Sequence, residues 1–281
     1  MSISFSKLLA FSLSVTLLLS LFGCGKQTPS AVAPPSEPPS VADETTDTTD
    51  TTDTATPPTP PSPTPVTATT PESSPLPDVH PVNLSIPESA AVSDDYFADA
   101  IFIGNSRTEG FVLYSGLSNV RALDAIGLTV KTAFSKPLIT MDGQKLTVMD
   151  ALAKQSFSKV YIMLGMNELG WVYGSVFQED YGKIIDRIRE INPNATIFIQ
   201  SILPVSKEKS ASHPTDNNPR IAEYNNLLRD LANEKNVYFL NVAEAIADEN
   251  GDLPADASTD GMHLIPDYCK KWLAYLKTHT I

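Results

Sequence analysis

The residue types best suited to chemistry in this chain are a serine, a histidine and an aspartate, at Ser106, His263 and Asp260. A serine hydroxyl becomes a good nucleophile only when a base accepts its proton, and imidazole is the commonest such base. A carboxylate three residues before the histidine can hold the other ring nitrogen and stabilise the charged ring. These types predict nucleophilic attack on a carbonyl. The alternatives are that Ser106 caps a helix and that Asp260 caps a loop.

Attack of this kind places negative charge on an oxygen, and that charge needs hydrogen-bond donors to stabilise it. Asn167, in Gly165-Met166-Asn167, can donate through its side-chain amide. The backbone N–H groups of Ser106 and Gly127 are the other candidates for such an oxyanion hole. The alternative is that Asn167 and Gly127 are turn residues. No cluster of His, Cys and carboxylate residues has metal-ligand spacing, so no metal is expected.

Short apolar runs precede several of these residues and predict buried strands. Strands are expected over 100–103, 120–125, 159–164, 196–200 and 237–240, with helices near 149–154, 181–191, 221–231 and 265–276. Asp142-Gly143 between β-prone runs predicts a small hairpin, and 206–218 is expected to be a polar loop. The alternation of strands and helices predicts a parallel sheet covered on both faces. Ligands of such sheets bind outside the carboxyl ends of the strands, where Ser106 and Asn167 are expected.

The 281 residues and the net charge of −13 are divided unevenly along the chain. Residues 1–24 have Lys7, an apolar run and Gly23-Cys24, the pattern of a secretory signal. Residues 25–92 hold 16 of the 23 prolines and nine acidic residues against one lysine, which predicts a disordered, extended spacer. Residues 93–281 have the length of one domain, and they show no basic patch typical of nucleic-acid binding.

The order of the motifs resembles that of the SGNH hydrolases, the GDSL-type esterases. That family has a Ser in Gly-Asp-Ser, a Gly, an Asn in Gly-x-Asn and a His in Asp-x-x-His. The matching residues here, from about residue 95 onward, are Ser106, Gly127, Asn167 and Asp260 with His263. The resemblance implies a flavodoxin-like three-layer α/β/α sandwich with a five-stranded parallel sheet in the order 2-1-3-4-5. One departure is Asn105, where the family usually has Asp.

A second resemblance concerns the start of the chain. Leu21-Phe22-Gly23-Cys24 is similar to the bacterial lipobox, although Phe22 is bulkier than the usual residue. This implies that Cys24 is lipidated, becomes the mature N-terminus and anchors the protein to the cell membrane. The alternative is a plain signal peptide with an incidental cysteine.

Together the resemblances imply an extracytoplasmic, lipid-anchored serine esterase that removes acyl groups, with acetyl groups on cell-surface carbohydrate as the expected substrate. No cofactor is implied. An acetyl transferase or lipid-ester hydrolase of the same family is an alternative. A non-catalytic lipoprotein that binds glycan through a decayed site is another, and Asn105 is the feature that favours it.

Overall fold

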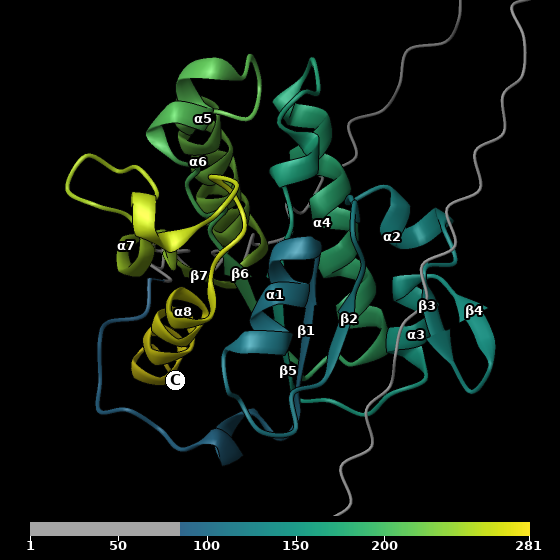
Figure 1. Cartoon of the computed structure of the whole chain (residues 1–281). Coiled ribbons are helices and arrows are strands. Elements are labelled where there is room, and N and C mark those ends of the chain that lie inside the picture. Colours follow the sequence, from purple (N-terminus) through teal and green to yellow (C-terminus); the bar gives the residue numbers. More distant parts are fainter. Residues whose placement is uncertain (1–84) are drawn as a thin grey trace, which may run out of the picture. The chain divides into compact units, whose positions relative to one another are not determined.

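The computed structural model describes residues 85–281, which form a sheet with helices on both faces (Figure 1). The predicted signal peptide, Cys24 and residues 25–84 of the predicted spacer lie outside the described residues. Within the described part, no helix combines the length and the apolar character needed to cross a bilayer.

Five parallel strands form the main sheet, in the order β2-β1-β5-β6-β7. They are β1 (Ala100–Gly104), β2 (Ala122–Asp124), β5 (Lys159–Met163), β6 (Thr196–Gln200) and β7 (Tyr238–Leu240). Numbered among themselves in chain order, these strands have the order 2-1-3-4-5. The predicted sheet and strand order are therefore confirmed.

Alternate side chains of each strand enter two separate cores, because successive residues of a strand point to opposite faces. In β1, Ile101 and Ile103 pack on the face covered by α3 (Val148–Ala153), α4 (Gly174–Ile191) and α6 (Asn218–Lys235). Ala100 and Phe102 pack on the face covered by α1 (Ser106–Tyr114) and α8 (Pro266–Thr278). The predicted three-layer arrangement is therefore correct (Figure 1).

An aromatic ladder holds the three central strands in register. Phe102, Tyr161 and Phe198 lie opposite one another on β1, β5 and β6. Their ring centroids are 4.9 Å and 4.4 Å apart, and both pairs are stacked. Such cross-strand aromatic pairs stabilise a sheet beyond the burial of their surface. The ladder thereby fixes the relative positions of the strand ends.

The remaining elements are short. They are η1 (Asp94–Phe97), α2 (Thr132–Ser135), β3 (Ile139–Met141), β4 (Gln144–Leu146), η2 (Met166–Glu168), α5 (Lys207–Ser212), α7 (Ala243–Ile246) and η3 (Ala255–Ala257). The β3–β4 pair is the predicted hairpin, and both turn residues, Asp142 and Gly143, have positive φ.

The prediction of a polar loop over 206–218 is wrong in part, because this segment contains α5. The Ser206 side chain begins that helix by accepting a hydrogen bond from the Lys209 N–H.

The two ends of the described chain lie against each other. Ser85 forms a parallel bridge with Phe239, and the N–H of Ser89 donates to the carbonyl of Thr278 at 2.7 Å. The contacts of the chain with the domain thus begin before residue 93, the predicted domain start. Near the C-terminal end of the described chain, the ring of His279 stacks on Tyr275 and is buried.

Candidate active site

Ser106 is the first residue of α1, directly after the carboxyl end of β1. Asn105 is the N-cap of that helix, and its side-chain oxygen accepts a hydrogen bond from the Arg107 N–H at 3.1 Å. Ser106 is therefore not the capping residue, and its hydroxyl is available for other contacts. Asn and Asp cap helices about equally well, so the departure at Asn105 keeps the turn geometry and removes only a charge.

Gly104 lets α1 start close to the strand. A Cβ added at Gly104 would lie 1.9 Å from Thr108 Oγ1 and 2.8 Å from the carbonyl oxygen of Met163. Any larger residue would push the first turn of α1 away from the sheet. The close approach therefore fixes where the hydroxyl of Ser106 lies.

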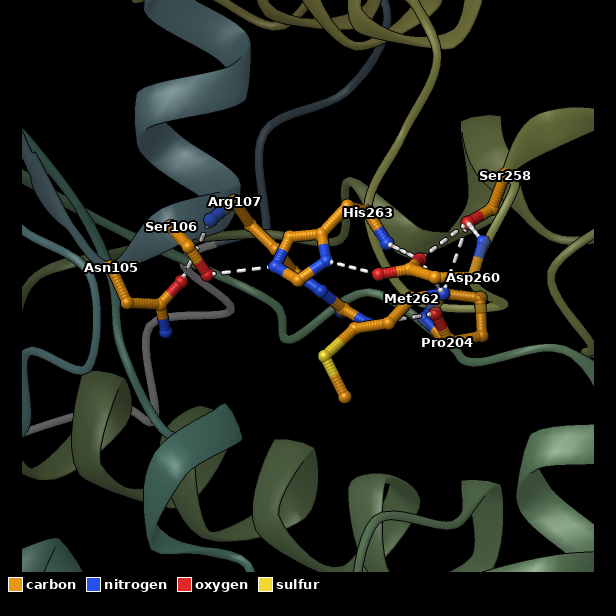
Figure 2. Close-up of polar contacts among 8 residues, drawn as sticks. All are labelled: Asn105, Ser106, Arg107, Pro204, Ser258, Asp260, Met262 and His263. Carbon is orange, nitrogen blue, oxygen red and sulfur yellow. Dashed lines mark hydrogen bonds and ion pairs between the residues drawn. The ribbon is translucent and has the colours of Figure 1, made fainter. Parts of the chain in front are cut away.

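Ser106, His263 and Asp260 form a continuous hydrogen-bonded line (Figure 2). Ser106 Oγ lies 2.9 Å from His263 Nε2, and His263 Nδ1 lies 2.6 Å from Asp260 Oδ2. An ionised carboxylate can only accept hydrogen bonds, so Nδ1 carries the ring proton and donates a hydrogen bond to Asp260. Nε2 is then free to accept the hydroxyl proton of Ser106. The histidine and aspartate side chains are about half exposed, so a ligand can reach the line.

Asp260 is held by donors on both oxygens. Its Oδ1 accepts from the N–H groups of Met262 and His263, at 2.9 and 2.8 Å, and from the hydroxyl of Ser258 at 2.9 Å. Partial burial alone would raise the pKa of Asp260, but the hydrogen bonds from His263, Met262 and Ser258 outweigh it and hold that pKa well below its usual range. The carboxylate is therefore ionised at neutral pH. Ser258 was not singled out from the sequence, because a serine two residues before an aspartate is too common a pattern.

The structure brings the loops of Asn167 and Gly127 together. Asn167 Nδ2 donates to the carbonyl of Leu128 at 2.9 Å, which uses one of its two hydrogens. Gly127, with φ of 73°, lies in a turn closed by the bond from the Leu128 N–H to the Ala125 carbonyl. These loops follow β5 and β2, the strands on either side of β1. Among the described residues, neither Asn167 nor Gly127 hydrogen-bonds to Ser106 or His263, and both are exposed.

The side chain of Glu168 links the loop after β5 to the loop after β2. Its side chain is fully buried, and Oε1 accepts from the N–H of Val130 at 2.7 Å. Burial raises the pKa of Glu168 to about 7, although backbone N–H groups, that of Val130 foremost, act to lower it. Glu168 therefore acts as a structural hydrogen-bond acceptor between the two loops.

Glu168→Gln should remove a pH dependence from the stability of the domain. Because folding raises the pKa of Glu168 from an ordinary value of 4.5 to about 7, the folded chain between these pH values holds a proton that the unfolded chain has lost. The stability supplied by the protonated carboxyl is complete below about pH 4.5. It is lost as the pH rises through about 7, and the loss totals about 3 kcal/mol.

Denaturant titrations across this pH range measure the effect. The wild type should lose stability as the pH rises and Glu168→Gln should not, while the exposed Glu249→Gln serves as the matched control. Parallel pH profiles in the wild type and Glu168→Gln would contradict the assignment.

Arg107 and His213 are two further polar residues that the structure places. Arg107 forms no ion pair with an acid among the described residues. Its guanidinium is buried and donates to the backbone carbonyls of Leu203 and Pro204. His213 is an exposed residue, and its Nδ1 accepts a hydrogen bond from the N–H of Asp216.

Two further observations concern the free cysteine and possible metal ligands of the described residues. Cys269 is a buried residue of α8, and burial raises the pKa of its thiol to about 11. Within residues 85–281, no three His, Cys, Asp or Glu side chains are grouped so that they could hold a metal ion.

A parallel α/β sheet whose carboxyl edge presents a serine, a histidine and an aspartate in one hydrogen-bonded line defines a serine hydrolase. The family model of the GDSL-like lipases/acylhydrolases matches residues 102–267, and this chain belongs to that family. It is therefore an ester hydrolase of the serine type. No curated protein matches the sequence.

Solved structures show the same fold at low sequence identity. A structure described as a GDSL-like lipase of Parabacteroides merdae is 15% identical, with a TM-score of 0.51, covering 69% of this chain and 99% of that one. The acetyl xylan esterase AlAXEase is 16% identical, with a TM-score of 0.50 and coverages of 65% and 99%. A protein of Streptococcus pneumonia, described as a platelet activating factor, is 21% identical, with a TM-score of 0.50 and coverages of 64% and 82%.

Proposed function

We propose that this protein is a serine esterase that removes acetyl groups from carbohydrate outside the cytoplasm. The observation that carries the proposal is the hydrogen-bonded line from Ser106 through His263 to Asp260. Ser106 Oγ attacks the ester carbonyl while His263 Nε2 accepts its proton, and the C–O bond to the sugar then breaks as the sugar oxygen takes that proton. Water, deprotonated by the same nitrogen, releases acetate and restores the serine.

Three donors are proposed to form the oxyanion hole. They are the backbone N–H groups of Ser106 and Gly127 and the second hydrogen of the Asn167 amide. The first hydrogen of that amide already binds the Leu128 carbonyl, which orients the group before any substrate arrives. A donor oriented in advance needs no rearrangement as charge develops on the carbonyl oxygen.

Support for a carbohydrate comes from the surface beside Asp260. A cleft of about 450 Å³ opens there between α5 and the loop before α8, and its lining includes Ser206, Ser212, Ser258 and Thr259 together with the charged Glu208 and Lys209. Hydroxyl-rich walls suit a sugar better than a lipid chain, which would favour apolar walls. One solved structure of similar fold is described as an acetyl xylan esterase, which supports the proposal of an acetylated carbohydrate.

Labelling and a panel of esters test the proposal together. A fluorophosphonate should label the purified domain at Ser106, and acetylated sugars should be cleaved faster than longer acyl or lipid esters. Acetyl transfer to an added sugar would favour the transferase instead. Absence of labelling with retained glycan binding would favour the non-catalytic lipoprotein.

Asn167→Ala should lower kcat roughly a hundredfold, because loss of one oxyanion donor costs about 3 kcal/mol in the transition state. KM should change little. The control is Asn192→Ala, since Asn192 also donates its amide to a backbone carbonyl, that of Phe157, at the far end of the sheet. Kinetics on fluorophosphonate-titrated enzyme measure both, and an unchanged kcat in Asn167→Ala would leave this residue a turn residue only.

Membrane anchoring through Cys24 is proposed from the lipobox-like sequence. Cys24→Ala should release the protein into the medium or leave it with an uncleaved signal peptide, because no thiol remains for lipid. Fractionation and N-terminal sequencing of the variant decide this. A mutant that is normally cleaved and stays in the membrane would show that something else anchors the protein.

A further inference from the structure

Arg107, the residue after the nucleophile, is a buried cation that forms no ion pair with an acid of the described chain. The residue is only 3% exposed, and no carboxylate among the described residues is within ion-pair distance. Burial lowers the pKa of Arg107 to about 10, while the charges of Asp260 and Asp216 act to raise it, so the group stays protonated. Its Nε has no hydrogen-bond partner within the described part of the chain.

The guanidinium donates hydrogen bonds to two backbone carbonyls, and these belong to consecutive residues. Nη1 donates to the carbonyl of Leu203, and Nη2 donates to that of Pro204 at 3.1 Å. A planar fork with several donors is suited to grasp two neighbouring oxygens at once, which a lysine cannot do. Burying a charge in this way is costly, even when backbone carbonyls accept its hydrogen bonds. The position therefore calls for a reason other than stability.

The segment that accepts hydrogen bonds from Arg107 is itself hydrogen-bonded to the loop that carries His263. Just after Pro204, the N–H of Ser206 donates to the carbonyl of Gly261 at 2.8 Å. Gly261 follows Asp260 and precedes His263 by two residues. Its φ is 75°, and a Cβ added there would lie 2.7 Å from Ser206 Oγ, so the two segments approach closely. Figure 2 shows the Arg107 side chain extending from beside Ser106, past the ring of His263, to Pro204.

These contacts connect the start of α1 to the loop before α8 through the segment after β6. We propose that Arg107 is a positioning residue that sets the separation of Ser106 Oγ and His263 Nε2. Its hydrogen bonds hold the 203–204 segment in place, and that segment in turn holds the loop that carries Asp260 and His263. This inference rests on the proposed hydrolytic role of Ser106 and His263, and it assigns Arg107 no contact with the substrate.

Arg107→Met tests the inference, because methionine fills similar space without donors or charge. Misplacing a reacting group by about 1 Å costs roughly a hundredfold in rate, so kcat per titrated site should fall about that much while KM stays within about twofold. Arg189→Met is the matched control. Arg189 likewise donates to two consecutive backbone carbonyls, those of Lys235 and Asn236, but from the last turn of α4, and its kcat should not change.

A second variant separates positioning from folding. In Arg107→Ala, added guanidinium ions should recover activity by about tenfold or more, whereas sodium chloride at the same ionic strength should not. Wild type and Arg189→Ala should gain nothing from guanidinium. A kcat of Arg107→Met within about threefold of the wild type, or no recovery of Arg107→Ala, would overturn the inference.

The rate of fluorophosphonate labelling distinguishes this failure from failure of the proposed function. Labelling needs the nucleophile and base in place but no natural substrate. If the wild type is labelled yet cleaves none of the acetyl esters, the substrate proposal fails, and Arg107→Met should still be labelled about a hundredfold more slowly. Equal labelling rates in the wild type and Arg107→Met would refute the positioning role alone.

Discussion

Ser106→Ala should lower kcat for ester hydrolysis by about 10⁵-fold or more, because no other group at the site can form the acyl-enzyme. The melting temperature should stay close to that of the wild type. The lost hydroxyl makes one partly exposed hydrogen bond, to His263, which contributes on the order of 1 kcal/mol. The helix cap belongs to Asn105 and remains intact.

Hydrolysis of an acetyl ester by wild type and Ser106→Ala, each with a thermal melt, measures the effect. Ser135→Ala is the matched control, since it removes an exposed hydroxyl from α2. Residual activity of Ser106→Ala above one per cent of the wild type would assign the nucleophile to another residue.

Asp260→Asn should reduce kcat by about 10⁴-fold through the wrong tautomer of His263. The N–H groups of Met262 and His263 both donate to Oδ1, so the amide of an asparagine must keep its oxygen there. Its NH₂ group then faces His263 Nδ1, where the carboxylate was. Nδ1 must accept, the ring proton moves to Nε2, and Nε2 can no longer accept a proton from Ser106.

Because the aspartate acts through the histidine, the two substitutions should not add. His263→Ala alone should be about as inactive as His263→Ala combined with Asp260→Asn, since residues of one proton relay fail as a unit. kcat values for the two single variants and the double variant, per folded enzyme, test this. A double variant that is slower by the product of the two single losses would show that Asp260 has a separate role.

Much of the fold could be predicted because its strands are buried on both faces. Runs such as Lys159–Met163 are apolar almost throughout, which leaves few alternatives to a central parallel strand. The six-residue α5 was missed because it buries no residue and so shows no apolar periodicity. Its sequence signal is the cap at Ser206, which is weak by itself.

At the site, the contacts that could be predicted were those between residues close together in the sequence. Asp260 and His263 are three residues apart, so their pairing follows from one turn of chain. The contacts of Arg107 reach residues 96 and 97 positions away, and no local pattern marks a guanidinium that binds carbonyls instead of an acid. Glu168 and Val130 are 38 positions apart and are likewise joined only by the fold.

The distance along the chain between nucleophile and base has a kinetic meaning. Ser106 belongs to the first strand–helix unit and His263 to the loop before the last helix, 157 residues later. The hydroxyl of Ser89 and the carbonyl of Thr278 are separated by 189 residues. Contacts of such long range form late in folding, because the entropy of closing the chain opposes them until the sheet is assembled. The relay therefore cannot exist in a chain that has been synthesised only as far as a residue before His263, and such a chain cannot hydrolyse an ester through it.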